Sequence, residues 1–106
     1  MDITLVRILL KQLCKQPTGD ENGMSANAVF DWGFAPGYDE QRESVRTHNE
    51  LLVSKGIAQV ERLRMKHHDD YAVLTPTEDG RIWCRYAYDD QQWEQHSDEL
   101  RLLLTA

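Results

Sequence analysis

The chain has 106 residues, of which 41% are hydrophobic and 28% are charged, and its formal net charge is −6. This length suits one domain with a single hydrophobic core. No run of about 18 apolar residues is present, which excludes a membrane-spanning helix. The acidic balance excludes nucleic-acid binding through overall basicity, so DNA binding would need a local basic patch.

The first predicted element is a helix over residues 2–16. Its apolar side chains recur at the three- and four-residue spacing of a buried helical stripe: Ile3, Val6, Leu10, Leu13 and Cys14. Residues 17–25 are rich in Pro, Gly, Asn and Asp, and this composition predicts a loop.

A strand is predicted next, over residues 26–34. Phe30, Trp32 and Phe34 alternate with smaller or polar residues, which is the period of a strand, and Pro36-Gly37 follows. We expect the aromatic side chains to face the helices and the strand to pair with a later hairpin.

The chain then returns to helical spacing, which predicts a second helix over residues 39–55. Gly56 is a typical C-terminal stop for such a helix. Residues 57–65 and 71–74 have the character of two strands, and the polar residues 66–70 between them have the length of a hairpin connection.

Two more helices are predicted after the hairpin. Thr75-Pro76-Thr77-Glu78 matches a helix start with a Thr cap, Pro at the first helical position and Glu at the third. Asp89-Asp90 then interrupts the pattern, and a last helix is expected from about Gln91. This order predicts an α+β winged helix with a small antiparallel sheet, although one long helix stands where a helix-turn-helix has two. We expect one domain over residues 1–106, with residues 75–106 as a C-terminal helical extension.

Several short motifs resemble those of a family of short, uncharacterised winged-helix proteins found in bacteria and their prophages. Residues 48–57 resemble its His-x-x-Leu-Leu-x-x-x-Gly-Leu/Ile element, and Gly37-Tyr38 lies near the position of its Gly-Tyr pair. Leu74-Thr75, Glu78-x-Gly80 and Asp89-Asp90-x-x-Trp93 resemble its Leu-Thr-(Trp)-Glu-Gly and acidic-Trp segments, although the first Trp is missing here. The resemblance implies the fold, with one longer helix in the helix-turn-helix region, and implies no established activity.

The two cysteines, Cys14 and Cys84, lie in apolar stretches and not in a closely spaced pair. We expect both to be free thiols in the core, as is usual in a reducing compartment. The N-terminal residues have neither the basic region nor the cleavage site of a signal peptide. The expected location is therefore cytoplasmic.

No catalytic, cofactor or metal site is predicted. His67-His68 and Asp69-Asp70 are metal-binding residue types, but adjacent side chains of an extended segment point to opposite faces and rarely share an ion. His48 is expected to contact a backbone carbonyl. Because the chain also lacks a Gly-rich phosphate loop, a nucleophile elbow and a His-Glu-x-x-His motif, we expect it not to be an enzyme.

Two sets of residues are candidates for binding double-stranded DNA. On the second helix, a spacing of four and three residues predicts that three side chains capable of base contacts project together: Arg42, Arg46 and Asn49. On the hairpin, three bases at every second position share one strand face and are expected to contact phosphates: Arg62, Arg64 and Lys66. The function favoured by these residues is that of a DNA-binding transcriptional regulator, and the resemblance implies a phage or prophage origin.

The acidic residues on the same helix support an alternative function. Glu40, Glu43 and Glu50 help to give residues 39–56 four acids against three bases. The alternative is a non-catalytic protein-binding module, such as a phage accessory protein that binds a host protein through an acidic surface. A merged basic patch would favour DNA, and a patch interrupted by carboxylates would favour a protein partner. The acidic C-terminal helices either pack on the first helix or form a homodimer.

Overall fold

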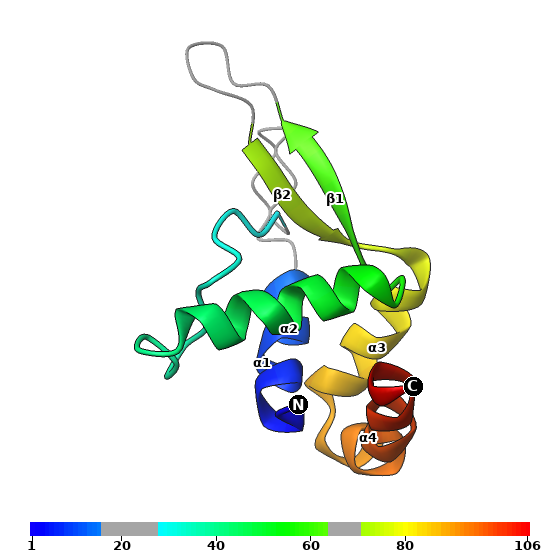
Figure 1. Cartoon of the computed structure of the whole chain (residues 1–106). Coiled ribbons are helices and arrows are strands. Elements are labelled where there is room, and N and C mark those ends of the chain that lie inside the picture. Colours follow the sequence, from blue (N-terminus) through cyan, green and yellow to red (C-terminus); the bar gives the residue numbers. More distant parts are fainter. Residues whose placement is uncertain (16–27, 64–70) are drawn as a thin grey trace.

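The computed structural model describes residues 1–15, 28–63 and 71–106. In these ranges the chain forms four helices and one two-stranded antiparallel sheet, an α+β fold (Figure 1). The two strands lie side by side and extend away from the helices, and both chain ends lie on the helical side of the molecule. None of the helices in the described ranges is long and apolar enough to cross a membrane.

Helix α1 (Ile3–Leu13) confirms the first predicted helix. Asp2 caps it, because its Oδ1 atom accepts the backbone N–H groups of Thr4 and Leu5 at 3.0 and 3.2 Å. Of the predicted stripe, Val6, Leu10 and Leu13 are buried, whereas Ile3 and Cys14 are only partly buried. Two further leucines, Leu5 and Leu9, complete the buried face. This wider apolar face packs against α2, α3 and the sheet.

The strand predicted over residues 26–34 is wrong for most of its length. Residues 26 and 27 lie outside the described ranges, and after them only Val29 pairs, in an isolated antiparallel bridge to Leu74. The two backbone hydrogen bonds of this bridge measure 2.9 and 3.0 Å. The predicted pairing with the hairpin is therefore confirmed at a single residue.

The chain leaves the sheet after this bridge because Asp31 starts a turn. Its Oδ1 atom accepts the backbone N–H of Gly33 at 3.0 Å, and its carbonyl oxygen accepts that of Phe34 at 3.3 Å. Such a side-chain contact offers the backbone an alternative to a strand ladder. Phe30 and Phe34 are each 44% exposed as a result, so the expectation that they face the helices is wrong.

Helix α2 (Arg42–Ser54) starts three residues later than predicted and ends one residue earlier. Its buried side chains are Val45, Asn49 and Leu52. Gly56 has a φ of +74°, the left-handed conformation that glycine adopts without strain, which confirms it as the stop of this helix.

Strands β1 (Ala58–Leu63) and β2 (Tyr71–Pro76) confirm the predicted hairpin. They pair antiparallel, with Ala58 opposite Pro76 and Leu63 opposite Tyr71.

The helix start predicted at Thr75-Pro76 is wrong, because both residues end β2. Helix α3 (Glu78–Tyr88) is capped by Thr77, whose Oγ1 atom accepts the N–H of Gly80 at 3.0 Å. Pro76 is tolerated because it occupies the last position of the strand. The third helical residue is Gly80, so no Glu side chain completes a capping box.

Helix α4 (Asp90–Thr105) confirms the last predicted helix and the break before it. Asp89 ends α3 and caps α4, with its Oδ1 atom accepting the N–H of Gln92 at 3.0 Å. Leu100 and Leu104 are buried in the same core as α1.

The side chain of Arg7 connects α1 to the turn between α3 and α4. Its Nε atom donates to the carbonyl oxygen of Ala87 at 2.9 Å, and its guanidinium forms an ion pair with Asp90. The same guanidinium lies 5.5 Å from the ring centre of Trp93, within the range of a cation–π contact. The C-terminal helices therefore pack on the first helix of the same chain, which is the first of the two predicted arrangements.

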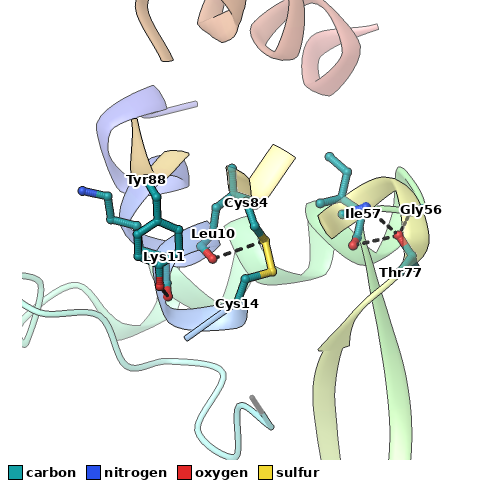
Figure 2. The surroundings of a disulfide bond; sticks show 9 residues. Leu10, Lys11, Cys14, Gly56, Ile57, Thr77, Cys84 and Tyr88 are labelled. Carbon is teal, nitrogen blue, oxygen red and sulfur yellow. Dashed lines mark hydrogen bonds between the residues drawn. A yellow bond between two sulfur atoms is a disulfide. The ribbon is translucent and has the colours of Figure 1, made fainter. Parts of the chain in front are cut away.

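The expectation of free cysteines is wrong, because Cys14 and Cys84 form a disulfide (Figure 2). It joins the end of α1 to α3 across 70 residues of sequence, with the Cα atoms 5.9 Å apart. Spacing alone does not reveal such a pair, since it depends on how the two helices pack. Disulfides are typical of oxidising compartments, so the cysteines no longer support the expected cytoplasmic location.

Candidate functional site

An open groove of about 410 Å³ lies between α2 and β2. The segment that follows the Val29 bridge forms its third wall. The groove is lined by Phe30, Asp31, Trp32, Arg46, Glu50 and Ala72. It therefore contains one of the candidate DNA-binding residues together with two carboxylates and two aromatic rings.

Trp32 is held in place from both sides of this groove. Its indole Nε1 atom donates to the carbonyl oxygen of Ala72 on β2 at 3.1 Å. Its own carbonyl oxygen accepts a hydrogen bond from Asn49 Nδ2 on α2 at 2.7 Å. These two contacts connect the helix, the turn segment and the sheet, so the groove has a defined wall.

Asn49 is not available to read a base, and this candidate is wrong. It is only 4% exposed, and its amide N–H donates to Trp32. Asn49 lies four residues after Val45 and three before Leu52, so it shares their buried face. Three residues make slightly less than one helical turn, so the side chain of Asn49 is rotated by about 60° relative to that of Arg46. This rotation places Asn49 on the side of α2 that faces the core, whereas Arg46 stays exposed.

Arg42 is exposed but already has a partner. Its Nη2 atom donates to both carboxylate oxygens of Asp31 at 2.9 Å. This guanidinium, together with the N–H of Gly33, holds the pKa of Asp31 below its ordinary value of 3.8. An exposed ion pair of this kind contributes little to stability. It nevertheless places a carboxylate beside the guanidinium of Arg42, where DNA would have to bind.

Two candidates remain, Arg46 in the groove and Arg62 on the hairpin beside it. Arg46 lines it one helical turn before Glu50. Arg62 is exposed and lies opposite Ala72 in the sheet, so the two side chains leave the same face of the hairpin. Arg64 and Lys66 lie outside the described residues, so their predicted position on this face stays a prediction.

Three aromatic residues of this surface were assigned to the core or left unassigned from the sequence. Phe30 and Tyr71 are 44% and 41% exposed, and their rings meet edge to face with centres 6.1 Å apart. Trp32 is half-buried in the groove wall. For Phe30 and Trp32, the spacing of Asp31 and Gly33 is the signal that would have found them, because it matches a turn closed by an Asp side chain.

Near the N-terminus, a second polar cluster joins Asp2, Tyr38 and His48. The Tyr38 hydroxyl donates to Asp2 Oδ2 at 3.0 Å, and the backbone N–H of Asp2 donates to His48 Nε2 at 3.0 Å. His48 Nδ1 lies 2.7 Å from the carbonyl oxygen of Ser44, which confirms its predicted backbone contact. The N–H of Leu5, followed by the hydroxyl of Tyr38 and the N–H of Thr4, holds the pKa of Asp2 below its ordinary value of 3.8.

This cluster predicts an acid-dependent contribution to stability. A carboxyl whose pKa is depressed by folding stabilises the fold above its unfolded value near 3.8, and this contribution disappears as the pH falls through the folded pKa. Asp2→Asn keeps a good cap but removes the charge. We expect the melting temperatures of the two proteins to differ most above pH 4 and to converge below it. The control is Asp98→Asn on the exposed part of α4, and a difference that is constant with pH would contradict the prediction.

Comparisons of the chain with protein-family models, with curated proteins and with solved structures found no match. Among residues 1–15, 28–63 and 71–106, no three His, Cys, Asp or Glu side chains are grouped to hold a metal ion. The segment His67-His68-Asp69-Asp70 lies outside these ranges. The functional argument therefore depends on the geometry of the groove.

Proposed function

We propose that this chain is a non-catalytic interaction module that binds a protein partner in the groove between α2 and β2. The observation that carries the proposal is that Asp31 and Glu50 line the same groove as Arg46. A polyanion such as DNA would meet both carboxylates, whereas a protein surface can match charges of both signs. Exposed aromatic rings beside an Arg side chain are also typical of the centre of protein interfaces.

DNA binding as a transcriptional regulator is the second candidate, and the position of Arg46 and Arg62 favours it. In a winged helix, the exposed side of α2 would enter the major groove and the hairpin would contact phosphates. This function ranks second because Arg42 faces Asp31 and Asn49 is buried.

The winged-helix assignment is part of the same proposal, and the order of α1, the Val29 bridge, α2 and the hairpin supports it. The resemblance of the sequence motifs adds a bacterial or prophage origin, and a host protein is the partner that we propose. A cytoplasmic location is also only proposed, and the Cys14–Cys84 disulfide does not support it. A homodimer through α4 also remains a proposal, supported by Leu102, which is 71% exposed.

Site-specific photocrosslinking tests the proposed function. Ala72 lines the groove and is exposed, so a photoreactive benzoylphenylalanine at this position would lie beside a bound partner. We expect adducts in cells that produce the protein, and these should be destroyed by protease and resist nuclease. Gln95, exposed on α4, is the matched control position. Nuclease-sensitive adducts would support the regulator instead, and the absence of adducts from Ala72 would contradict the groove as a site.

A further inference from the structure

We propose that the partner segment which occupies this groove is basic, with an Arg or Lys side chain lying on the rings of Phe30 and Trp32 and pairing with Glu50. This inference rests on the proposed function of the groove and adds the chemistry of its partner. Three features of the structure support it: the charge around the groove, its aromatic lining and its shape.

The first feature is the charge around the groove. Two of its three charged lining residues are carboxylates, and the whole chain has 18 acidic against 12 basic side chains. Asp31 is paired with Arg42, but none of the ion pairs between described residues includes Glu50. A cation that approaches the groove is therefore attracted by the net charge of the protein and by the exposed carboxylate of Glu50.

The second feature is the aromatic lining. The face of an aromatic ring is electron-rich, so it attracts a guanidinium or ammonium group and repels a carboxylate. Phe30 is 44% exposed in the groove, and Trp32 is fixed by its hydrogen bond to Ala72. The chain already uses this chemistry elsewhere, where Arg7 lies on Trp93. An acidic segment could pair with Arg46 but would meet the rings and both carboxylates.

The third feature is the shape of the site. The groove is an open depression between a helix and the hairpin and does not enclose its contents. Sites for small molecules bury most of their ligand, whereas a shallow groove admits one side chain of an extended segment. A peptide segment that carries the cation fits this shape better than a free small cation.

Short peptides test the inference with the full-length protein. The probes are acetyl-Gly-Arg-Gly-Arg-Gly-amide and the matched peptide with Glu in place of Arg. Nuclear magnetic resonance of the ¹⁵N-labelled protein distinguishes the indole N–H of Trp32 from those of Trp83 and Trp93. We expect the Arg peptide to shift the Trp32 signal at low salt and the Glu peptide to leave it unchanged.

Two charge variants give opposite expected results. Glu50→Gln should weaken binding of the Arg peptide about two- to fivefold, the range of an exposed ion pair. Arg46→Gln should strengthen it by a similar factor, because a like charge leaves the groove. Glu94→Gln on α4 makes the same charge change away from the groove and should weaken binding less than Glu50→Gln. If the surface binds DNA instead, Arg46→Gln should weaken the binding of a random DNA duplex.

The outcomes separate this inference from the proposed function. Protein adducts from Ala72 together with no response of Trp32 to the Arg peptide would overturn the basic partner alone. Tighter binding of the Glu peptide, or weaker binding of the Arg peptide by Arg46→Gln, would also overturn it. If Ala72 gives no protein adducts, the proposed function itself fails.

Discussion

Reduction of the Cys14–Cys84 disulfide is expected to lower the free energy of unfolding by about 4 kcal/mol. The bond closes a loop of 70 residues, and in the chain-entropy model such a loop strongly restricts the unfolded state. A domain of this size has a total stability of about 5–15 kcal/mol, so the loss would be a large share. Urea unfolding with and without dithiothreitol measures it.

The double variant Cys14→Ser/Cys84→Ala is the control for this experiment. It lacks the bond, so reductant should not change its urea midpoint. Cys84 is 3% exposed beside the carbonyl oxygen of Leu10, and Ala at this position avoids an unpaired buried hydroxyl. Equal midpoints of the wild-type protein with and without reductant would contradict the prediction, and alkylation with mass spectrometry would then show whether the bond had formed.

Gly80→Ala is expected to destabilise the fold by about 3 kcal/mol or more, at or above the upper range for overpacking. A Cβ atom at this position would lie 2.0 Å from the carbonyl oxygen of Ile57. That oxygen is part of the backbone and also accepts the N–H and hydroxyl groups of Thr77, so it cannot move without loss of the cap (Figure 2). The start of α3 would have to move away from the residue that precedes β1.

To check this prediction, the melting temperatures of Gly80→Ala and of the control Arg81→Ala are compared with that of the wild-type protein. Arg81 is exposed in the same helix and has nearly the helix propensity of Ala, so its replacement should change stability by less than about 0.5 kcal/mol. Propensity alone predicts that Gly80→Ala stabilises the helix by about 1 kcal/mol. A raised melting temperature would therefore show that the close approach to Ile57 does not constrain the fold.

The sequence by itself determined those features that depend on neighbouring residues. The apolar stripe of α1, the stop at Gly56 and the break at Asp89-Asp90 all lie where the local pattern predicts them. The hairpin and the backbone contact of His48 were predictable for the same reason. Helical periodicity, caps and glycine conformations act within a few residues, so they can be recognised without knowledge of the rest of the chain.

Only the tertiary structure decided the features that depend on which surfaces meet. The alternation of Phe30, Trp32 and Phe34 is equally compatible with a strand and with a turn, and the contact of Asp31 with Gly33 selects the turn. Arg46 and Asn49 are only three residues apart on α2, but the direction of the core leaves Arg46 exposed and buries Asn49. The Cys14–Cys84 pair and the groove join segments distant in sequence, and their proximity follows from the packing of whole elements rather than from any local pattern.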